Sequence, residues 1–307
     1  MKRTFVITGA TGNIGNRVAR LLLNQDQSVR VLGRSRERLQ PLIDLGATPY
    51  VGDMRDLALV TELFRGADAA LLVCKGNRTS RDYRTEFAGA GRTYAAAAQA
   101  TGLKSAVFIS SLGAHDERNR GLILMHGDVE QILNEVDGLN VVHLRAPGFF
   151  ENLFYFLPLM REHQRLITPI ALDARLEMAA TADVADIAVQ LLSDLGFGGK
   201  SVIEIYGQRE VTMTQIAKLL GEAIERPFPA EFLERDDDIE RMVRAGIGRD
   251  FATLMNDVWS SISRRSQKSD QKVGTRRATT EIETFLRQRL VPALQAAAPA
   301  AAAVGAR

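Results

Sequence analysis

The segment Thr4–Gly15, TFVITGATGNIG, constrains the fold more than any other part of the chain. An apolar run ends at Thr8, and glycines follow at positions 9, 12 and 15. After a first strand, such glycines permit a tight turn, let the backbone approach a pyrophosphate, and let a helix pack closely with its N-terminal amides facing the phosphates. The G-x-x-G-x-x-G spacing is a variant of the dinucleotide fingerprint. Its place between a strand pattern and an amphipathic helix predicts a nucleotide site.

Short β-branched runs alternate with helical patterns through the first half of the chain. The predicted strands are Thr4–Thr8, Ser28–Gly33, Thr48–Gly52, Ala69–Cys74, Ser105–Ser110 and Asn140–Arg145. They are apolar on both faces, as a parallel sheet covered by helices on both sides requires. Helices are predicted between them, for example over 16–24 and 82–100. This order predicts an α/β fold with a doubly wound parallel Rossmann sheet.

The second half of the chain has a looser pattern. It contains helical patterns over 181–194 and after Thr212 or Thr214, and another near 278–290, where Thr280 and Glu283 have the spacing of a capping box. We expect the following division: a nucleotide-binding core over 1–150, completed by parts of 179–207, a smaller C-terminal substrate lobe over 151–290, and a flexible Ala-rich tail over 291–307.

Composition indicates an ordinary globular protein, with 46% hydrophobic and 25% charged residues in 307. No apolar stretch reaches the ~18 residues of a membrane span, and no signal peptide precedes the first strand pattern, so a membrane partner is not expected. A single cysteine excludes a disulfide framework and a Cys-rich metal site, which agrees with a reducing, cytoplasmic location and no metal.

Nucleic acid is also not expected as a partner, because the formal net charge is only +2. The densest basic run, Ser263–Arg277, has no interleaved aromatic residue and no nucleic-acid motif. We interpret it as a solvated, mobile loop rather than a surface for an acidic partner.

The end of the second predicted strand bears on the choice between NAD and NADP. An NAD site usually has an acidic residue there, whereas a 2′-phosphate requires Arg or Lys. Arg34 and Ser35 occupy this place, Arg36 is near, and no acid appears before Glu37. The pattern favours NADP(H). The alternative is that Arg34 and Arg36 are exposed charges at a strand end.

Other predicted strand ends supply further candidates. Asp53 and Met54 are suited to holding an adenine amino group and ring face, although the spacing fits a turn Asp that caps the next helix equally well. Four residues follow the fourth and fifth strands, where ligands bind in such sheets, and are candidates for the nicotinamide end: Cys74, Lys75, Ser110 and Ser111.

Taken together, these motifs resemble the NmrA-like group of the atypical short-chain dehydrogenase/reductase superfamily, which includes NADPH-dependent quinone reductases and isoflavone-type reductases. The resemblance runs from about Thr4 to Leu290. It rests on ITGATGNIG, VRVLGRS, GDMRD, SAVFISSLGA, HGDVEQILNEVDGLNVVHLRAPGFFEN, TADVADIAV and GTRRATTEIETFL, in this order.

The resemblance implies NADP(H) as cofactor and a role for each matching position. The pyrophosphate would lie against Gly9, Thr11, Gly12, Asn13, Ile14 and Gly15, the 2′-phosphate against Arg34, and the adenine against Asp53 and Met54. The nicotinamide end would lie against the turn Cys74–Gly76 and against Pro147, Gly148 and Phe149.

One departure concerns the Tyr-x-x-x-Lys pair of classical members, whose tyrosine donates a proton to the carbonyl. Here His126 stands at the lysine position and Leu122 at the tyrosine position. Quinone reductases of the group resemble this segment, with a His followed by Glu four residues later, as in His126 and Glu130. A quinone forms a stable anion on accepting hydride, so the loss of the tyrosine is chemically tolerable.

His126 and Ser111 are therefore the catalytic candidates. His126 would bind the nicotinamide ribose or supply a proton; the alternative is a histidine at a helix start near solvent. His115 is interpreted as an ordinary polar loop residue. The run Phe149, Phe150, Phe154, Tyr155 and Phe156 is either core or, for about two members, the wall of a pocket. Phe150, Asn152 and Tyr155 are the substrate candidates.

These observations support two hypotheses of different kinds. The first is an NADPH-dependent oxidoreductase that reduces a quinone, enone or ketone of a small aromatic substrate. The second is an NADP(H)-binding redox sensor of NmrA type without turnover, which has no need of a proton donor. A nucleotide-sugar epimerase or dehydratase would need the missing tyrosine. The sequence leaves the substrate and the oligomeric state open, a homodimer included.

Overall fold

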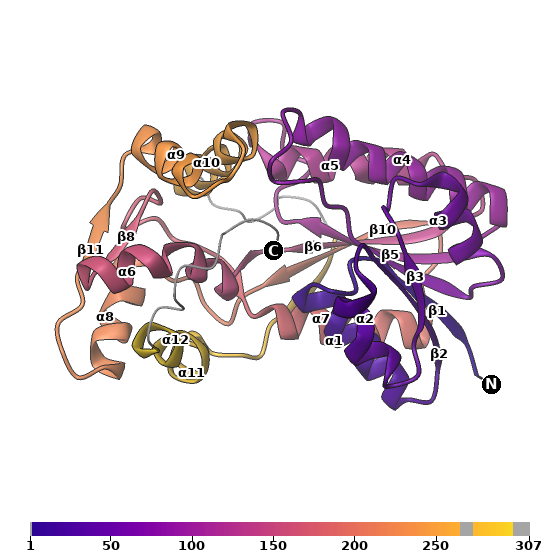
Figure 1. Ribbon diagram of the computed structural model, residues 1–307, viewed down its shortest axis with the longest axis horizontal. Coiled ribbons are helices and arrows are strands. Elements are labelled where there is room, and N and C mark those ends of the chain that lie inside the picture. The colour runs from indigo at the N-terminus through magenta and orange to yellow at the C-terminus, as the bar shows by residue number, and fades with distance from the viewer. Residues whose placement is uncertain (1, 265–272, 297–307) are drawn as a thin grey trace.

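The computed structural model describes residues 2–264 and 273–296, which build a large parallel sheet, helices on both of its faces, and a lobe at one end (Figure 1). Across the sheet the strands are β12 (Gly274–Arg277), β10 (Lys200–Tyr206), β6 (Asn140–Ala146), β5 (Ser105–Ser111), β4 (Ala69–Leu72), β1 (Thr4–Ile7), β2 (Ser28–Gly33) and β3 (Thr48–Val51). Each pair of neighbours is parallel. The predicted α/β fold with a doubly wound sheet is confirmed.

Helices cover the two faces of the sheet in two layers (Figure 1). One layer contains α1 (Asn13–Asn24), α2 (Arg36–Ile43) and α7 (Thr181–Asp194), and the other α3 (Leu57–Phe64), α4 (Tyr83–Thr101) and α5 (Leu122–Asn134). Helix α1 shows why these segments pack: its apolar residues Val18, Ala19 and Leu22 lie on one buried stripe against the sheet. Both faces of the central strands are therefore buried, as their continuous apolar runs predict.

The direction of the winding reverses between β1 and β4. Strands β1, β2 and β3 follow each other toward one edge, and β4 then returns to pair with β1 on its other side. A crevice forms at the carboxyl ends of the strands where the order reverses, and ligands bind there in open α/β sheets. The glycine turn after β1 and the loop after β4 meet at this point: a Cβ on Gly9 would lie 3.0 Å from Val73 Cβ.

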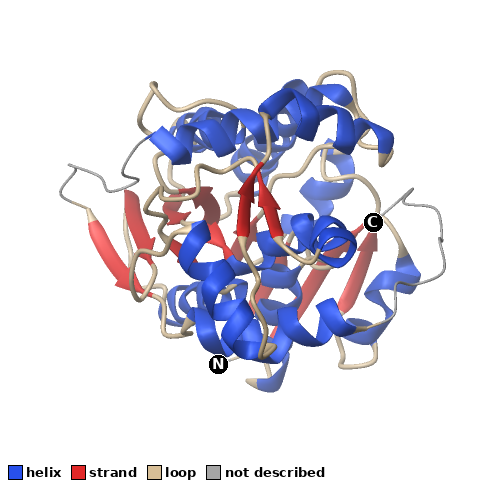
Figure 2. Ribbon diagram, turned by 90° about the vertical axis from the view of Figure 1, so that its left-hand side faces the viewer, coloured by secondary structure: helices blue, strands red, loops and turns tan. Residues whose placement is uncertain are grey.

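The lobe lies at the carboxyl ends of the sheet strands (Figures 1 and 2). It contains the 3₁₀ segment Phe150–Phe156, α6 (Leu157–His163), α8 (Met213–Ala223), α9 (Arg235–Arg244), α10 (Arg249–Arg264), α11 (Ile282–Phe285), a π-helical turn over Leu286–Leu290 and α12 (Val291–Gln295). Two short parallel pairs complete it, β8 (Leu166–Thr168) with β11 (Ala230–Phe232), and β7 (Gly148–Phe149) with β9 (Met178–Ala179). Its core is continuous with that beneath α3, α4 and α5.

Two segments that the sequence indicated as mobile contain regular structure. The end of the basic run, Gly274–Arg277, is the edge strand β12, paired with β10, while residues 265–272 lie outside the described part of the chain. The expected tail begins with α12, whose Val291 and Leu294 are buried, and residues 297–307 are not described. The interpretation was wrong only for Gly274–Arg277 and Val291–Gln295, because these residues pair or pack with partners that are distant in sequence.

The capping-box prediction at Thr280 is also wrong. Helix α11 begins after Glu281 and has no side-chain cap. The hydroxyl and the backbone N–H of Thr280 instead donate to the carboxylate of Asp183 at the start of α7, at 2.9 and 3.0 Å. A buried carboxylate needs such donors. A complete capping box occurs at α8, where Thr212 caps the helix with Gln215.

Candidate active site

The glycine turn after β1 brings the backbone close together at the reversal point. Gly9 has φ +62°, a conformation that favours glycine, and its carbonyl accepts a hydrogen bond from Gly12 N at 2.9 Å. Gly15 lies in the first turn of α1, where an added Cβ would stand 2.5 Å from the same carbonyl oxygen. Gly12 caps α1 without a side-chain hydrogen bond, so no side chain covers the first amides of the helix.

Replacing Gly15 by alanine is therefore expected to lower the free energy of unfolding by about 1–3 kcal/mol, the usual cost of overpacking. Chemical denaturation measures this directly. Gly196→Ala is the matched control, because no atom lies within 4 Å of the Cβ it would add. Equal stability of the two variants would contradict the packing account of Gly15.

A groove of about 220 Å³ runs from this turn along the ends of β2 and β3. It is lined by Gly9, Thr11, Gly12, Leu32, Gly33, Arg34, Ser35, Arg38, Gly52, Asp53, Met54, Arg55, Val73, Lys75, Gly76 and Asn77. Most of the residues predicted for a dinucleotide are thus brought together. Asn13 is exposed and lies outside the groove, Ile14 lines the neighbouring cavity, and Gly15 is buried beneath the turn.

The cationic end of the groove contains Arg34 and Arg38. Ser35 caps α2 by accepting a hydrogen bond from Arg38 N at 3.2 Å, which brings position 38 back beside the end of β2. Within the described residues neither arginine lies within 4 Å of a carboxylate, so both cations are free to bind an anion. Arg36, which the sequence placed near the site, lies outside the groove.

Asp53 lies in the groove and forms an ion pair with Arg55. Its oxygens accept from Arg55 Nε at 2.9 Å and Nη2 at 2.8 Å, and these bonds lower the pKa of the carboxyl. Asp56, not Asp53, caps α3 by accepting from Leu59 N at 3.1 Å. Asp53 therefore does not cap the helix, but it does close a turn by accepting from Arg55 N at 2.9 Å, and its carboxylate stays charged in the groove.

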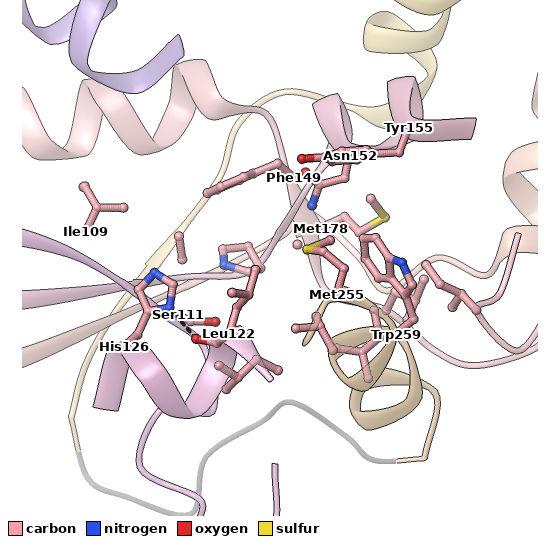
Figure 3. A pocket seen from close by; sticks show the side chains of 18 of the residues that line it. Ile109, Ser111, Leu122, His126, Phe149, Asn152, Tyr155, Met178, Met255 and Trp259 are labelled. Atoms are coloured by element: carbon pink, nitrogen blue, oxygen red, sulfur yellow. Dashed lines mark hydrogen bonds between the residues drawn. The ribbon is translucent and has the colours of Figure 1, made fainter. Parts of the chain in front are cut away.

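A second, larger cavity of about 310 Å³ lies between the sheet and the lobe (Figure 3). Figure 3 shows Ser111 and His126 on one side of it and Met255 and Trp259 on the other. Most of the wall is apolar and comes from the strand ends, α5, the 3₁₀ segment and α10. Predicted residues in this wall are Ile14, Cys74, Lys75, Ser110, Ser111, His126, Pro147, Gly148, Phe149, Asn152 and Tyr155.

His126 faces the cavity from the second turn of α5. Its Nδ1 lies 2.8 Å from the carbonyl oxygen of Leu122, and because a carbonyl only accepts, Nδ1 carries the proton. Burial lowers the pKa of the ring, which packs against Phe87 at a centroid distance of 4.9 Å. The imidazole is therefore neutral at pH 7, and its Nε2 is an acceptor rather than a donor.

A buried network of charges lies behind the wall at Ser110. The hydroxyl of Ser110 donates to Glu130 Oε1 at 2.6 Å, and Arg145 holds the same carboxylate through Nε at 2.9 Å and Nη2 at 2.7 Å. Glu204 lies 3.5 Å from Nη1 of Arg145, and His115 contacts that nitrogen through Nδ1 at 3.1 Å. Sequence reasoning missed Arg145 and Glu204, and it treated His115 as an ordinary loop residue. The signal that could have identified Arg145 and Glu204 is a charged residue inside an apolar strand pattern.

The aromatic run divides between the cavity and the core. Phe149, Tyr155 and Phe156 line the cavity, while Phe150 is buried against Phe285 with ring centroids 5.4 Å apart. Phe154 also packs on Phe285. The structure thus places the substrate candidate Phe150 outside the cavity wall, because a 3₁₀ segment turns successive side chains to different sides.

Two kinds of feature are absent from the described residues. No helix there is long and apolar enough to cross a membrane. No cluster of three or more His, Cys, Asp or Glu side chains in residues 2–264 and 273–296 is arranged to hold a metal ion. Cys74 is buried, and burial raises the pKa of its thiol.

Comparison with known proteins gives consistent results. An NAD(P)H azoreductase from Xenophilus azovorans is 23% identical over 256 residues, which cover 83% of this chain and 86% of the azoreductase. The crystal structure of an Escherichia coli NADPH-dependent quinone oxidoreductase complexed with NADPH matches with a TM-score of 0.74 and 26% identity, covering 87% of this chain and 92% of that one.

The fold is also shared with NmrA, a negative transcriptional regulator solved in complex with NADP. That match has a TM-score of 0.73 and 17% identity, and it covers 94% of this chain and 95% of NmrA. The model of the NmrA-like family matches residues 1–267. With most of its length matched and the same fold, the chain belongs to the NmrA-like family.

Proposed function

We propose that this protein is an NADPH-dependent oxidoreductase that reduces a quinone, enone or ketone of a small aromatic substrate. One observation carries the proposal: the groove with its two free arginines opens onto the apolar cavity, because Val73 and Lys75 line both. A nucleotide in the groove would therefore reach the cavity with its far end. The quinone oxidoreductase and azoreductase relatives support the same reaction class.

The residues of the groove fit NADP(H). The close approach of Gly15 to the Gly9 carbonyl leaves the turn without side chains where a pyrophosphate would lie. Gly9, Thr11 and Gly12 would hold the pyrophosphate, Arg34, Ser35 and Arg38 the 2′-phosphate, and Asp53 and Met54 the adenine. Pro147, Gly148, Phe149, Ser111 and His126 would surround the nicotinamide.

When bound, NADPH supplies the hydride, and the protein provides binding, orientation and exclusion of water. The apolar wall around Phe149, Met255 and Trp259 would hold a flat acceptor away from solvent. His126 would accept a hydrogen bond at Nε2 from a ribose hydroxyl, since its neutral ring has no proton there to give. Of the two roles that the sequence left open for His126, positioning is favoured over proton donation.

His126→Ala is expected to lower kcat/KM about tenfold, the value of one hydrogen bond to a well-placed acceptor. The melting temperature should stay within a few degrees of wild type. His126→Gln keeps an acceptor and should recover part of the loss, and the exposed His163→Ala is the matched control. An unchanged rate in His126→Ala would contradict a role at the site.

The second candidate function is an NADP(H)-binding regulator without turnover. Leu122, which stands at the expected position of the proton-donating tyrosine, lines the cavity and supplies no donor there. The shared fold with NmrA is consistent with this alternative. Saturable nucleotide binding with no turnover on a broad panel of acceptors would favour it. A reducing, cytoplasmic location, which the single cysteine suggests, is part of both proposals.

A further inference from the structure

Arg78 places a guanidinium in the wall of the larger cavity. It lies in the loop between β4 and α4, and its backbone carbonyl accepts a hydrogen bond from Gly248 N at 2.8 Å, just before α10. The guanidinium carbon lies 5.5 Å from the ring centroid of Tyr155 and 5.4 Å from that of Phe251. Cation–π attraction to two rings of the same wall therefore fixes the position of this charge.

The hydrogen-bonding capacity of Arg78 is largely unused. Its Nη2 donates to Tyr155 Oη at 2.8 Å, and within the described residues no carboxylate lies within 4 Å of it. A guanidinium has five N–H donors. Because Tyr155 accepts from Arg78, its own hydroxyl hydrogen is directed elsewhere and can serve as a second donor. Arg78 therefore offers several N–H donors to a ligand, and Tyr155 offers one O–H donor.

The charges around Arg78 increase its preference for an anion. Lys75 lines the same cavity, and burial, together with Arg78, Arg34 and Arg38, lowers the pKa of its ammonium group. The acidic side chain in the wall, Glu177, accepts a hydrogen bond from Gly207 N at 3.0 Å. Arg78 lines the larger cavity and not the nucleotide groove, so its charge faces the compartment of the acceptor.

We propose that the acceptor is an aromatic compound with a carboxylate substituent, and that Arg78 and Tyr155 bind this carboxylate together. The inference rests on the proposed reductase function, since it names a substituent of that acceptor. Arginine recognises a carboxylate through two parallel charge-assisted hydrogen bonds. The apolar wall takes the ring, and the Arg78–Tyr155 pair sets its orientation in the cavity.

Calorimetric titration with non-reacting probes tests the inference without turnover. The probes are 2-naphthoate and 2-naphthamide, which differ in charge, added to the full chain saturated with NADP⁺. Wild type should bind naphthoate at least about tenfold more tightly, because hydrogen bonds to charged groups are strong. Arg78→Gln should reduce this preference below about threefold, and Tyr155→Phe should reduce it in part. Arg81→Gln removes the same charge from an exposed position of the same loop and should keep the wild-type preference.

Three results would overturn the inference. The first is equal binding of the two probes to wild type, and the second is a naphthoate preference that is retained in both Arg78→Gln and Tyr155→Phe. The third is a loss of NADP⁺ affinity in Arg78→Gln as large as its loss of naphthoate affinity, because that result would assign the arginine to the cofactor. A failure of the reductase proposal is distinguishable. In that case no acceptor is reduced, while the naphthoate preference and its dependence on Arg78 persist.

Discussion

Arg34→Glu is expected to weaken NADPH binding about 100-fold while changing NADH binding less than about threefold. The variant loses charge-assisted hydrogen bonds to a 2′-phosphate and places a carboxylate against it, and bonds to charged groups contribute about 1.5–3 kcal/mol. A tenfold change in affinity corresponds to about 1.4 kcal/mol. NADH has no 2′-phosphate, so its affinity should hardly change. Fluorescence titration of both nucleotides measures the two constants.

Arg36→Glu is the matched control for this variant. Arg36 is exposed and two residues away, but it lies outside the groove, so the same charge reversal should alter NADPH affinity only slightly. Equal weakening of NADPH and NADH by Arg34→Glu, or an equal effect of Arg36→Glu, would contradict the assignment of Arg34 to the 2′-phosphate.

Arg145→Met is expected to lower the free energy of unfolding by about 3–5 kcal/mol. The substitution leaves the buried carboxylates of Glu130 and Glu204 without their shared cation, and breaking a buried pair costs this much. Arg145 is 4% and Glu130 6% exposed, so water cannot replace the lost partner. Urea denaturation at pH 7 provides the measurement.

The double variant Arg145→Met/Glu130→Gln should recover part of that stability, since it removes one of the two carboxylate charges that lost their partner. Arg17→Met breaks the exposed ion pair with Asp186 and should cost less than about 1 kcal/mol. A cost for Arg145→Met as small as that of Arg17→Met would show that the network does not stabilise the fold.

The parts of this molecule that the sequence predicted are those that local patterns specify. Adjacent residues encode the glycine turn, each apolar strand and each helix between them, so the doubly wound sheet could be predicted directly. The family was predicted from the resemblance of the motifs. Arg34 and Ser35 were predicted for the 2′-phosphate and Asp53 and Met54 for the adenine of one nucleotide, each from its place at a strand end, and all four line one groove.

The remaining features depend on residues that are distant in sequence. Arg38 reaches the groove only because Ser35 caps α2 and sets where that helix begins. Glu130 and Arg145 lie on different elements, and their pairing follows from the packing of α5 on the sheet. The strand β12 forms because β10 offers a free edge. Single-sequence patterns contain no signal for such partners, and the same holds for the place of Arg78 between Tyr155 and Phe251.

The most direct test of the proposed function is the loss of NADPH absorbance in the presence of a panel of quinones and aromatic ketones, run beside NADH, after titration has shown that nucleotide binds. We expect turnover with at least one quinone and a clear preference for NADPH over NADH. Saturable NADPH binding with no turnover on any member of the panel would contradict the reductase account and favour the regulator.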